Sequence, residues 1–350
     1  PPPMPGYHNT APPPPMPPRA APPRQAGAGW AERETHYDAQ ANDPQQSRAA
    51  ALAKRKGGAL YKYKLFANAV KRRMYGAYAR GAPAIVELGC GRGGDISKWR
   101  DARVRRVIAL DLSSAQLDEA RRREGQGGGR GRGGKGGGGG TQIEWRHASM
   151  LQPDLAASLR PRLPDDGAAA VVSQFAVHYA FESEASASAL LAQVAALLRP
   201  GGVFFGAAPD GDAILRAIAT DGDGRTLQRD GLLLRLEGAG DDAAAAGASE
   251  FGRLLLFSLQ DTVTAGSEHD DCTEFLLHRA ALVRLAAAPG LVPVELESMA
   301  ASAAEPASAA TALDAAQRYV AALYFTFAFR LEAPKAEEAP KASGGSDAST

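Results

Sequence analysis

The stretch AIVELGCGRGGD, residues 84–95, decides the expected fold of this 350-residue chain. Its first five residues predict a short buried strand, and four glycines follow before the next helical segment. Gly89, Gly91 and Gly94 match the G-x-G-x-x-G spacing of nucleotide-binding turns. Because glycine has no Cβ and tolerates positive φ, the backbone of such a turn can approach a ligand closely. The stretch therefore predicts a ligand lying across a strand-to-helix turn.

A carboxylate ends the next predicted strand. Residues 104–110 run apolar into Asp111, and residues 112–124 follow with helical spacing. A carboxylate at this place can accept hydrogen bonds from both hydroxyls of a ribose, although helix N-capping is an alternative role for Asp111. S-adenosylmethionine and NAD both present a ribose, so the pattern predicts a nucleoside cofactor without choosing between them. An ordinary glycine turn in an α/β domain is the remaining alternative.

Strand and helix patterns continue to alternate along the chain. A helix is expected at residues 185–199, ended by the sequence Pro200-Gly201-Gly202, and this alternation predicts a parallel sheet with right-handed crossovers. The further strands are expected at residues 142–146, 168–173, 203–206, 232–237, 253–259, 291–296 and 323–329.

Composition limits the domain organisation. The 39 glycines and 24 prolines gather in a few tracts. We expect a Pro-rich disordered tail at residues 1–30, one domain at 31–332 with a disordered Gly-rich insert at about 125–140, and a disordered tail at 333–350. The two cysteines, Cys90 and Cys272, are far apart and predict no disulfide framework. With no apolar run as long as a membrane span and no signal peptide, we expect a soluble intracellular protein, and we expect no metal.

A basic segment precedes the first strand. Residues 47–80 contain ten lysines and arginines, no acidic residue, and five interleaved aromatic residues. This pattern predicts an amphipathic basic helix or helix pair. A solvated helix face is the usual meaning of a charge run, but uncompensated cations repel one another, which favours a surface that faces a polyanion.

Five stretches in order resemble the eukaryotic mRNA cap guanine-N7 methyltransferase family. They are HYD at residues 36–38, FANAVK at 66–71, VELGCGRGGDISKW at 86–99, SQFAVHYAFES at 173–183, and CTEFLLH at 272–278 before a closing LYFTFAF at 323–329. The resemblance implies a class I, Rossmann-like S-adenosylmethionine-dependent methyltransferase: a mostly parallel seven-stranded sheet with helices on both faces. It also implies methyl transfer to N7 of the guanosine cap of mRNA, capped RNA as the partner beside the transcription or capping machinery, and residence in the nucleus.

The resemblance also implies roles for individual residues. Those matching the family's S-adenosylmethionine contacts are Lys71, Gly89, Asp111, Ser149, Gln174 and Tyr179. Those matching its cap contacts are Asn68, Arg92, Lys98, Arg123, His178, Glu274 and Tyr324. The chain departs from the family pattern at three places: Ser149 replaces an aspartate that holds the adenine amino group, Ala69 replaces a tryptophan, and Glu87 stands where aspartate is commoner. We expect the first departure to weaken cofactor binding.

These residue types suit the implied chemistry. Guanine N7 carries a lone pair and needs no general base, so catalysis is expected to depend on positioning. Glu274 can accept hydrogen bonds from guanine N1 and N2 and favour the positive charge that develops on the purine, while His178 and Tyr324 can stack on or edge the base. The cations Arg92, Lys98 and Arg123 are expected to bind the triphosphate, since S-adenosylmethionine has none.

Other functions remain open from the sequence. A methyltransferase acting on another RNA or on a small molecule could use the same sheet. An inactive cap-binding scaffold is a further alternative, motivated by Ser149 and Ala69. A dehydrogenase is the least favoured, because no downstream stretch resembles a nicotinamide site.

Overall fold

A computed structural model describes residues 34, 35, 38, 58, 60–127, 140–237, 249–259, 273–304 and 312–333. The predicted tails and most of the predicted insert lie outside these residues, as do His36, Tyr37 and Cys272. The domain limits therefore stay predictions.

The main sheet has seven strands in the order β10-β11-β5-β4-β1-β2-β3. The five strands β1 to β5 are parallel, and β11 pairs antiparallel with both β5 and β10. This confirms the predicted fold class. The bounds are β1 Ile85–Leu88, β2 Arg106–Asp111, β3 Gln142–His147, β4 Ala168–Gln174, β5 Leu198–Pro209, β10 Leu291–Ser298 and β11 Tyr324–Leu331.

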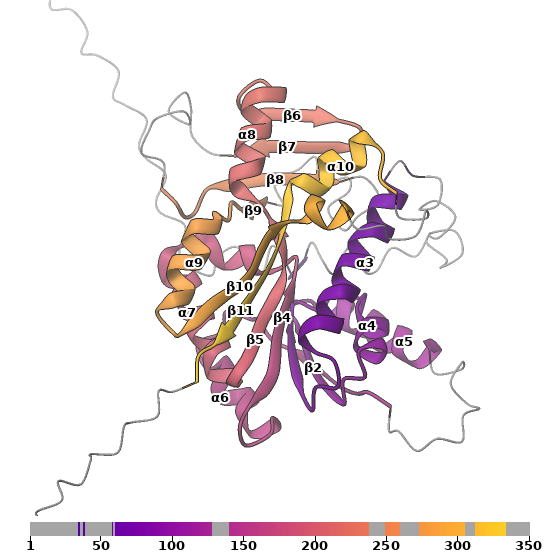
Figure 1. Ribbon diagram of the computed structural model, residues 1–350, viewed down its shortest axis with the longest axis vertical. Helices are drawn as coiled ribbons and strands as arrows, with labels where there is room; N and C mark the ends of the chain where they lie inside the picture. The colour runs from indigo at the N-terminus through magenta and orange to yellow at the C-terminus, as the bar shows by residue number, and fades with distance from the viewer. Residues whose placement is uncertain are drawn as a thin grey trace, which may run out of the picture.

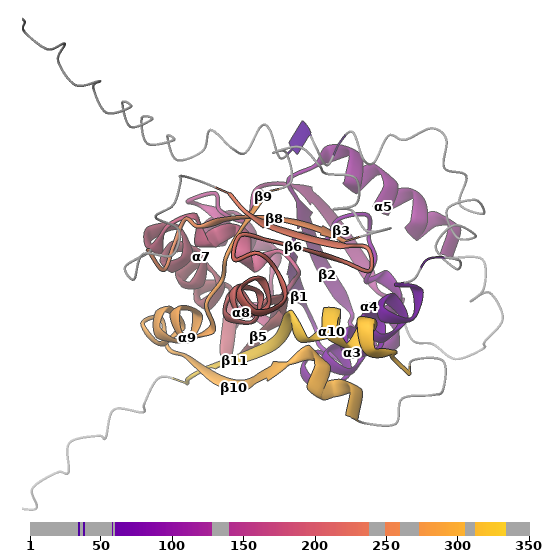
Figure 2. The ribbon, with the colours of Figure 1, turned by 90° about the horizontal axis from the view of Figure 1, so that it is seen from above.

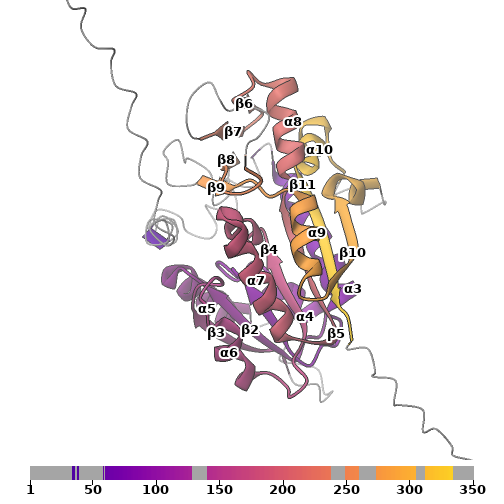
Figure 3. The same ribbon diagram turned by 90° about the vertical axis from the view of Figure 1, so that its left-hand side faces the viewer.

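Helices cover both faces of the sheet because alternate strand residues point to opposite sides. In β1, Ile85 belongs to the core under α3, α4 and α5, whereas Val86 belongs to the core under α6, α7 and α9. Figures 1 and 3 show the two helical layers on either side of the strands. The bounds are α3 Tyr61–Tyr78, α4 Ile96–Asp101, α5 Ser114–Gly127, α6 Leu155–Leu159, α7 Glu184–Leu197 and α9 Arg279–Ala287.

The strand β5 is longer than expected at its start. The helix α7 ends at Leu197 instead of residue 199, and Leu198 already pairs with Ala168 of β4. The buried side chain of Leu198 favours this earlier start. Pro200 then lies within the strand, next to a register irregularity between Ala168 and Ala170, which is where a residue without an N–H is tolerated.

A second, antiparallel sheet covers one end of the main sheet. Its order is β6-β7-β8-β9, with bounds β6 Thr226–Arg229, β7 Leu232–Leu236, β8 Leu254–Leu259 and β9 Thr273–Phe275. Figure 2 looks down on this sheet and shows its strands crossing over those of the main sheet. Apolar residues alternate along β7 and enter the same core as α3, together with α8 Gly211–Asp221 and α10 Ala315–Ala322. The sequence predicted neither β6 nor these two helices. The sheet brings the segment carrying Glu274 to the end of β4.

Candidate functional site

The glycine turn after β1 is held against the end of β2. The N–H groups of Gly89 and Cys90 donate to the Leu110 carbonyl at 2.9 and 3.0 Å. Gly89 has φ of 71°, and a Cβ there would lie 2.7 Å from the Cβ of Ala176. Only glycine fits this position, because both its conformation and its space exclude a side chain.

Asp111, at the end of β2, holds the turn from the other side. Its carboxylate accepts the N–H of Gly91 at 2.7 Å and the N–H of Ser113 at 3.0 Å. Burial raises the pKa of Asp111, an effect that these backbone donors partly oppose. The residue therefore organises the glycine turn and the start of α5, and it also faces the adjoining cavity.

This cavity, which we call the glycine-turn cavity, has a volume of about 370 Å³. It lies at the carboxyl ends of β1 to β4, where open α/β sheets bind ligands. The side-chain amide of Gln174 is 93% buried yet has no hydrogen-bond partner within the described part of the chain, which fits a polar ligand. All six residues predicted to bind the cofactor line the cavity: Lys71, Gly89, Asp111, Ser149, Gln174 and Tyr179.

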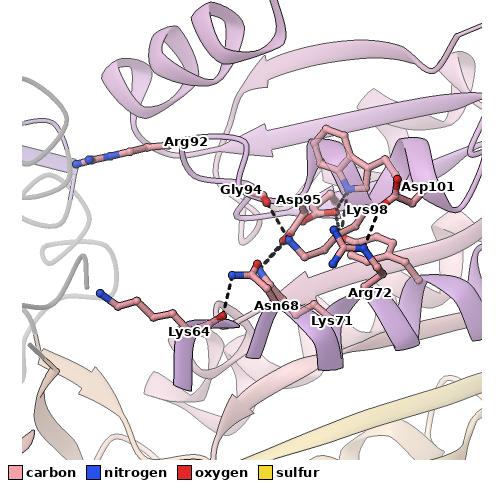
Figure 4. Close-up of polar contacts among 12 residues, drawn as sticks. Lys64, Asn68, Lys71, Arg72, Arg92, Gly94, Asp95, Lys98 and Asp101 are labelled. Atoms are coloured by element: carbon pink, nitrogen blue, oxygen red, sulfur yellow. Dashed lines mark hydrogen bonds and ion pairs between the residues drawn. The ribbon is translucent and has the colours of Figure 1, made fainter. Parts of the chain in front are cut away.

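A cluster of buried charges supports the Lys71 side of this cavity (Figure 4). The ammonium groups of Lys71 and Lys98 each lie 2.7 Å from a carboxylate oxygen of Asp95. Burial opposes ionisation of Asp95, but the two ammonium groups outweigh it and lower the pKa to about 2. Asp95 is therefore ionised and fixes the position of Lys71.

Lys98 differs from its expected placement. Its side chain is only 2% exposed, donates to the Gly94 carbonyl at 3.0 Å, and lines neither of the two cavities of the site. In this arrangement its ammonium is not presented to a phosphate. The motif GGDxxKW was predicted to offer the Lys98 ammonium to the substrate. The ammonium points into the protein instead, because Asp95, three residues earlier, lies on the same side of α4 and pairs with it.

Glu87 lies behind this cluster on β1 and is 99% buried. Its carboxyl accepts a hydrogen bond from the Trp99 indole at 2.7 Å and another from the Tyr75 hydroxyl. Burial, with a further contribution from the charge of Asp95, raises the pKa of Glu87 to about 8. The folded protein therefore holds Glu87 neutral at neutral pH.

We expect Glu87→Gln to flatten the dependence of stability on pH. The pKa of Glu87 is higher in the folded than in the unfolded chain, so the folded state binds more protons between pH 4.5 and 8 and loses stability as pH rises through that window. Urea unfolding at pH 6 and pH 8 should show this loss, on the order of 1–3 kcal/mol, in the wild type and less of it in the variant. Equal slopes in both proteins would contradict the assignment.

The second cavity, which we call the aromatic cavity, has a volume of about 240 Å³. Five tyrosine and phenylalanine rings line it: Tyr63, Phe175, Tyr179, Phe257 and Tyr324. The Tyr324 ring lies 5.3 Å from Phe175, 5.4 Å from Phe257 and 6.1 Å from Tyr63, measured between ring centroids. Burial raises the pKa of Tyr63 and of Tyr324, so these two hydroxyls are neutral. Such a box suits a flat aromatic ligand.

Polar groups meet the aromatic cavity on one side. His178, which follows β4, lies 3.4 Å from a Glu274 carboxylate oxygen, and the Tyr179 hydroxyl lies 3.5 Å from the other. Both nitrogens of His178 and one oxygen of Glu274 are buried without a hydrogen-bond partner in the described residues. Four of the seven residues predicted to bind the cap thus line this cavity: Asn68, His178, Glu274 and Tyr324.

Of the other three predicted cap residues, Arg92 and Arg123 line the glycine-turn cavity. Arg123 donates to Glu119 at 2.7 Å and to the Arg92 carbonyl at 3.1 Å. Arg92 donates to Gln116 at 3.1 Å, and Figure 4 shows its side chain extending away from the Asp95 cluster. The predicted triphosphate set is therefore divided: two arginines at one cavity, and Lys98 at neither.

Lys71, Phe175 and Tyr179 line both cavities, so the two spaces adjoin. Phe175 has φ of 60°, a left-handed conformation that is rare for a non-glycine residue and clusters at functional sites. The Lys71 ammonium lies 5.6 Å from the centre of its ring.

Sequence reasoning missed three aromatic residues of the site. Phe175 stands inside the quoted stretch SQFAVHYAFES, and Tyr63 stands among the aromatic residues of the basic segment, so both carried a signal. Phe257 carried none, because only the packing of the small sheet brings it to the cavity.

Comparison with known proteins decides the family. A model of the mRNA (guanine-N(7))-methyltransferase domain matches residues 31–301. The chain belongs to this family. An mRNA cap guanine-N(7) methyltransferase of Arabidopsis thaliana is 26% identical over 279 residues, 77% of this chain and 70% of that protein. The Saccharomyces cerevisiae enzyme of the same name is 32% identical over 166 residues, which are 46% of this chain. The Oryza sativa enzyme is 30% identical over 221 residues, which are 58% of this chain.

The chain spans 35% of the yeast relative and 56% of the rice relative. Among solved structures, a geranyl diphosphate C-methyltransferase from Streptomyces coelicolor covers 89% of this chain and 99% of its own, with a TM-score of 0.46 and 13% identity. A likeness that weak supports no conclusion about the present chain.

The structure places two residues that depart from the mRNA (guanine-N(7))-methyltransferase family pattern, Ser149 and Ala69, and one that matches it, Asp38. Ser149 lines the glycine-turn cavity, and its hydroxyl accepts the Leu151 N–H at 3.2 Å. Ala69 is half-buried on α3. Asp38, from the matched stretch at residues 36–38, accepts hydrogen bonds from the Ser113 hydroxyl and the Ala115 N–H at the start of α5.

Two features are absent from the part of the chain that the structure describes. Among the described residues, no three His, Cys, Asp or Glu side chains gather so that they could hold a metal ion. None of the helices described combines the length and the apolar character needed to span a bilayer.

Proposed function

We propose that this protein transfers a methyl group from S-adenosylmethionine to N7 of the guanosine cap of mRNA, converting GpppN-RNA to m7GpppN-RNA. The observation that carries the proposal is the shared lining of two cavities by Lys71, Phe175 and Tyr179. One cavity suits a nucleoside and the other suits a purine, and a methyl transfer needs the donor and the acceptor side by side.

The glycine-turn cavity would hold the cofactor. When bound, S-adenosylmethionine supplies a methyl group activated by a sulfonium. Asp111 would accept hydrogen bonds from the ribose, and the Gln174 amide, for which the described residues offer no hydrogen-bond partner, would bind the amino-acid part. Lys71, held in place by Asp95, supplies a cation for a carboxylate.

The aromatic cavity would hold the guanine. Glu274 would accept hydrogen bonds from guanine N1 and N2, and its charge would favour the positive charge that the purine gains on methylation. Tyr324, Phe175 and Phe257 would surround the base. N7 needs no base to remove a proton, so these residues act by positioning.

The phosphates would bind at the rim of both cavities. Arg92 and Arg123 approach from the glycine-turn cavity, and Asn68 lines the aromatic cavity. We assign Lys98 to positioning, because it holds Asp95 and through it Lys71. Capped RNA is thus the proposed substrate, with nuclear residence beside the capping or transcription machinery.

A methylation assay tests the proposal. Purified protein with methyl-labelled S-adenosylmethionine should label GpppA-RNA at N7 and leave the uncapped triphosphate RNA unlabelled. Absence of labelling under conditions where calorimetry shows cofactor binding would reject the catalytic proposal.

A second candidate, a cap-binding protein without activity, has one observation in its favour: Ser149 lines the cofactor cavity in place of an aspartate. No binding heat with millimolar S-adenosylmethionine, together with measurable binding of GpppG, would support it.

A further inference from the structure

A basin lined by arginines lies at the end of the main sheet opposite the site. It has a volume of about 1070 Å³ and is formed where β1, β2 and β3 begin. Among the residues that the structure describes, no acidic side chain lines it, and four of its lining residues are arginines: Arg100, Arg103, Arg105 and Arg106.

The charges of this arginine basin are only partly compensated. Arg106 pairs with Glu144 at 3.0 Å, whereas Arg103 and Arg105 are exposed. Four guanidinium groups within seven residues repel one another, and an anionic ligand would relieve that repulsion.

The helix α3 connects the basin with the aromatic cavity. Lys64 and Asn68, in its first turns, line the aromatic cavity, and Gly81, three residues beyond its end, lines the basin. Its 18 residues span about 27 Å, and Figure 1 shows it running along the sheet from the end covered by the small sheet toward the other end.

This helix carries only basic charged residues. It contains no acidic residue and five cations, which are Lys62, Lys64, Lys71, Arg72 and Arg73, and Arg80 follows it. Three of them pair with acidic neighbours: Lys71 with Asp95, Arg72 with Asp101 and Arg73 with Glu295. Lys62 at the start of α3 and Arg80 beyond its end are exposed, so exposed cations lie near both ends of the helix.

The chemistry of the basin favours a phosphate backbone over an acidic protein. Arginine forks bind phosphate oxygens in pairs, and a backbone of phosphates needs no apolar contact. A protein partner would need an apolar centre to its interface. The basin offers none, since its apolar members are the fully buried Val104 and the small Pro83.

We propose that α3 and the arginine basin form a docking track for the RNA chain that follows the cap. At about 3.4 Å per stacked nucleotide, the length of α3 corresponds to about eight nucleotides. A dinucleotide such as GpppG would fill the site without reaching the basin. The proposal rests on the proposed function only in taking capped RNA as the ligand, and RNA binding is measured without methyl transfer.

The test compares three proteins in binding a 3′-labelled, capped 20-nucleotide RNA over a range of salt concentrations. They are the wild type, Arg103→Gln/Arg105→Gln, and a matched control, Arg216→Gln/Arg229→Gln, which removes two exposed arginines from α8 and β6. The basin variant should bind several-fold more weakly at low salt. The slope of log affinity against log salt should become shallower by about 1.4, since each lost phosphate contact on a single strand contributes about 0.7.

Methylation separates this proposal from the proposed function. All three proteins should methylate GpppG equally, and only the basin variant should lose kcat/KM on the 20-nucleotide RNA. Unchanged affinity and salt slope in the basin variant, an equal loss in the control, or loss of GpppG methylation together with RNA binding would each overturn the docking track. If no protein methylates GpppG but the binding differences appear, the docking track stands and the catalytic proposal fails.

Discussion

Replacing Glu274 by alanine is expected to lower kcat/KM for capped RNA by on the order of 100-fold while leaving the affinity for S-adenosylmethionine near its wild-type value. A hydrogen bond to a charged group contributes about 1.5–3 kcal/mol, and in the proposed complex this carboxylate would accept two of them from one guanine edge. The cofactor should not be affected, because Glu274 lines the aromatic cavity and not the glycine-turn cavity.

The measurement pairs methylation kinetics on GpppA-RNA with calorimetry of S-adenosylmethionine on the same protein. Glu274→Gln serves as the matched variant. It keeps the size of the side chain, but its NH2 group would face one of the two guanine N–H donors and could not accept a hydrogen bond from it. It should therefore also lose activity. If Glu274→Ala lost cofactor affinity as strongly as methylation, the assignment of Glu274 to guanine binding would be wrong.

Asp111→Ala is expected to show the opposite pattern, with S-adenosylmethionine bound more weakly by ~1.5–3 kcal/mol, or about 10- to 150-fold in Kd. Part of this loss comes from the ribose, and part comes from the glycine turn, because the carboxylate also accepts the Gly91 N–H at 2.7 Å. Binding of GpppG, measured without cofactor, should change little.

Ser113→Ala provides the control for Asp111. The Ser113 hydroxyl accepts the Gln116 N–H at 3.1 Å at the start of α5, so its loss should reduce stability by about 1 kcal/mol without touching a ribose acceptor. Calorimetry should then find cofactor affinity weakened in Asp111→Ala and nearly unchanged in Ser113→Ala. Equal effects in the two variants would mean that Asp111 acts only through the local structure of the turn.

Much of the lining of the glycine-turn cavity could be predicted from the sequence, because short sequence patterns specify the residues that form it. The strand-turn-helix pattern around residues 84–95 and the carboxylate at Asp111 follow directly from strand ends and glycine spacing. In a parallel sheet these ends meet at one edge, so Gly89, Asp111, Ser149 and Gln174 come together once the strand order is right. The resemblance to the family supplied Lys71 and Tyr179.

The direction in which a charged side chain points could not be predicted from the neighbouring residues in the sequence. Lys98 and Arg92 both read as cations available to a phosphate, yet one is buried against Asp95 and the other lines a cavity. That difference depends on whether an anionic partner lies within reach inside the fold. Likewise, the raised pKa of Glu87 depends on burial between Tyr75 and Trp99, residues from two different helices.

The sequence by itself determined the strands of the main sheet, the glycine turn and the carboxylate at the end of β2, since short-range spacing and hydrophobic periodicity specify them. Only the tertiary structure decided that Glu274 of the small sheet meets His178 after β4, and that α3 joins the aromatic cavity to the arginine basin. Glu274 and His178 are 96 positions apart in the chain, so no local pattern relates them. They meet because the apolar faces of two sheets and one helix are buried in a common core.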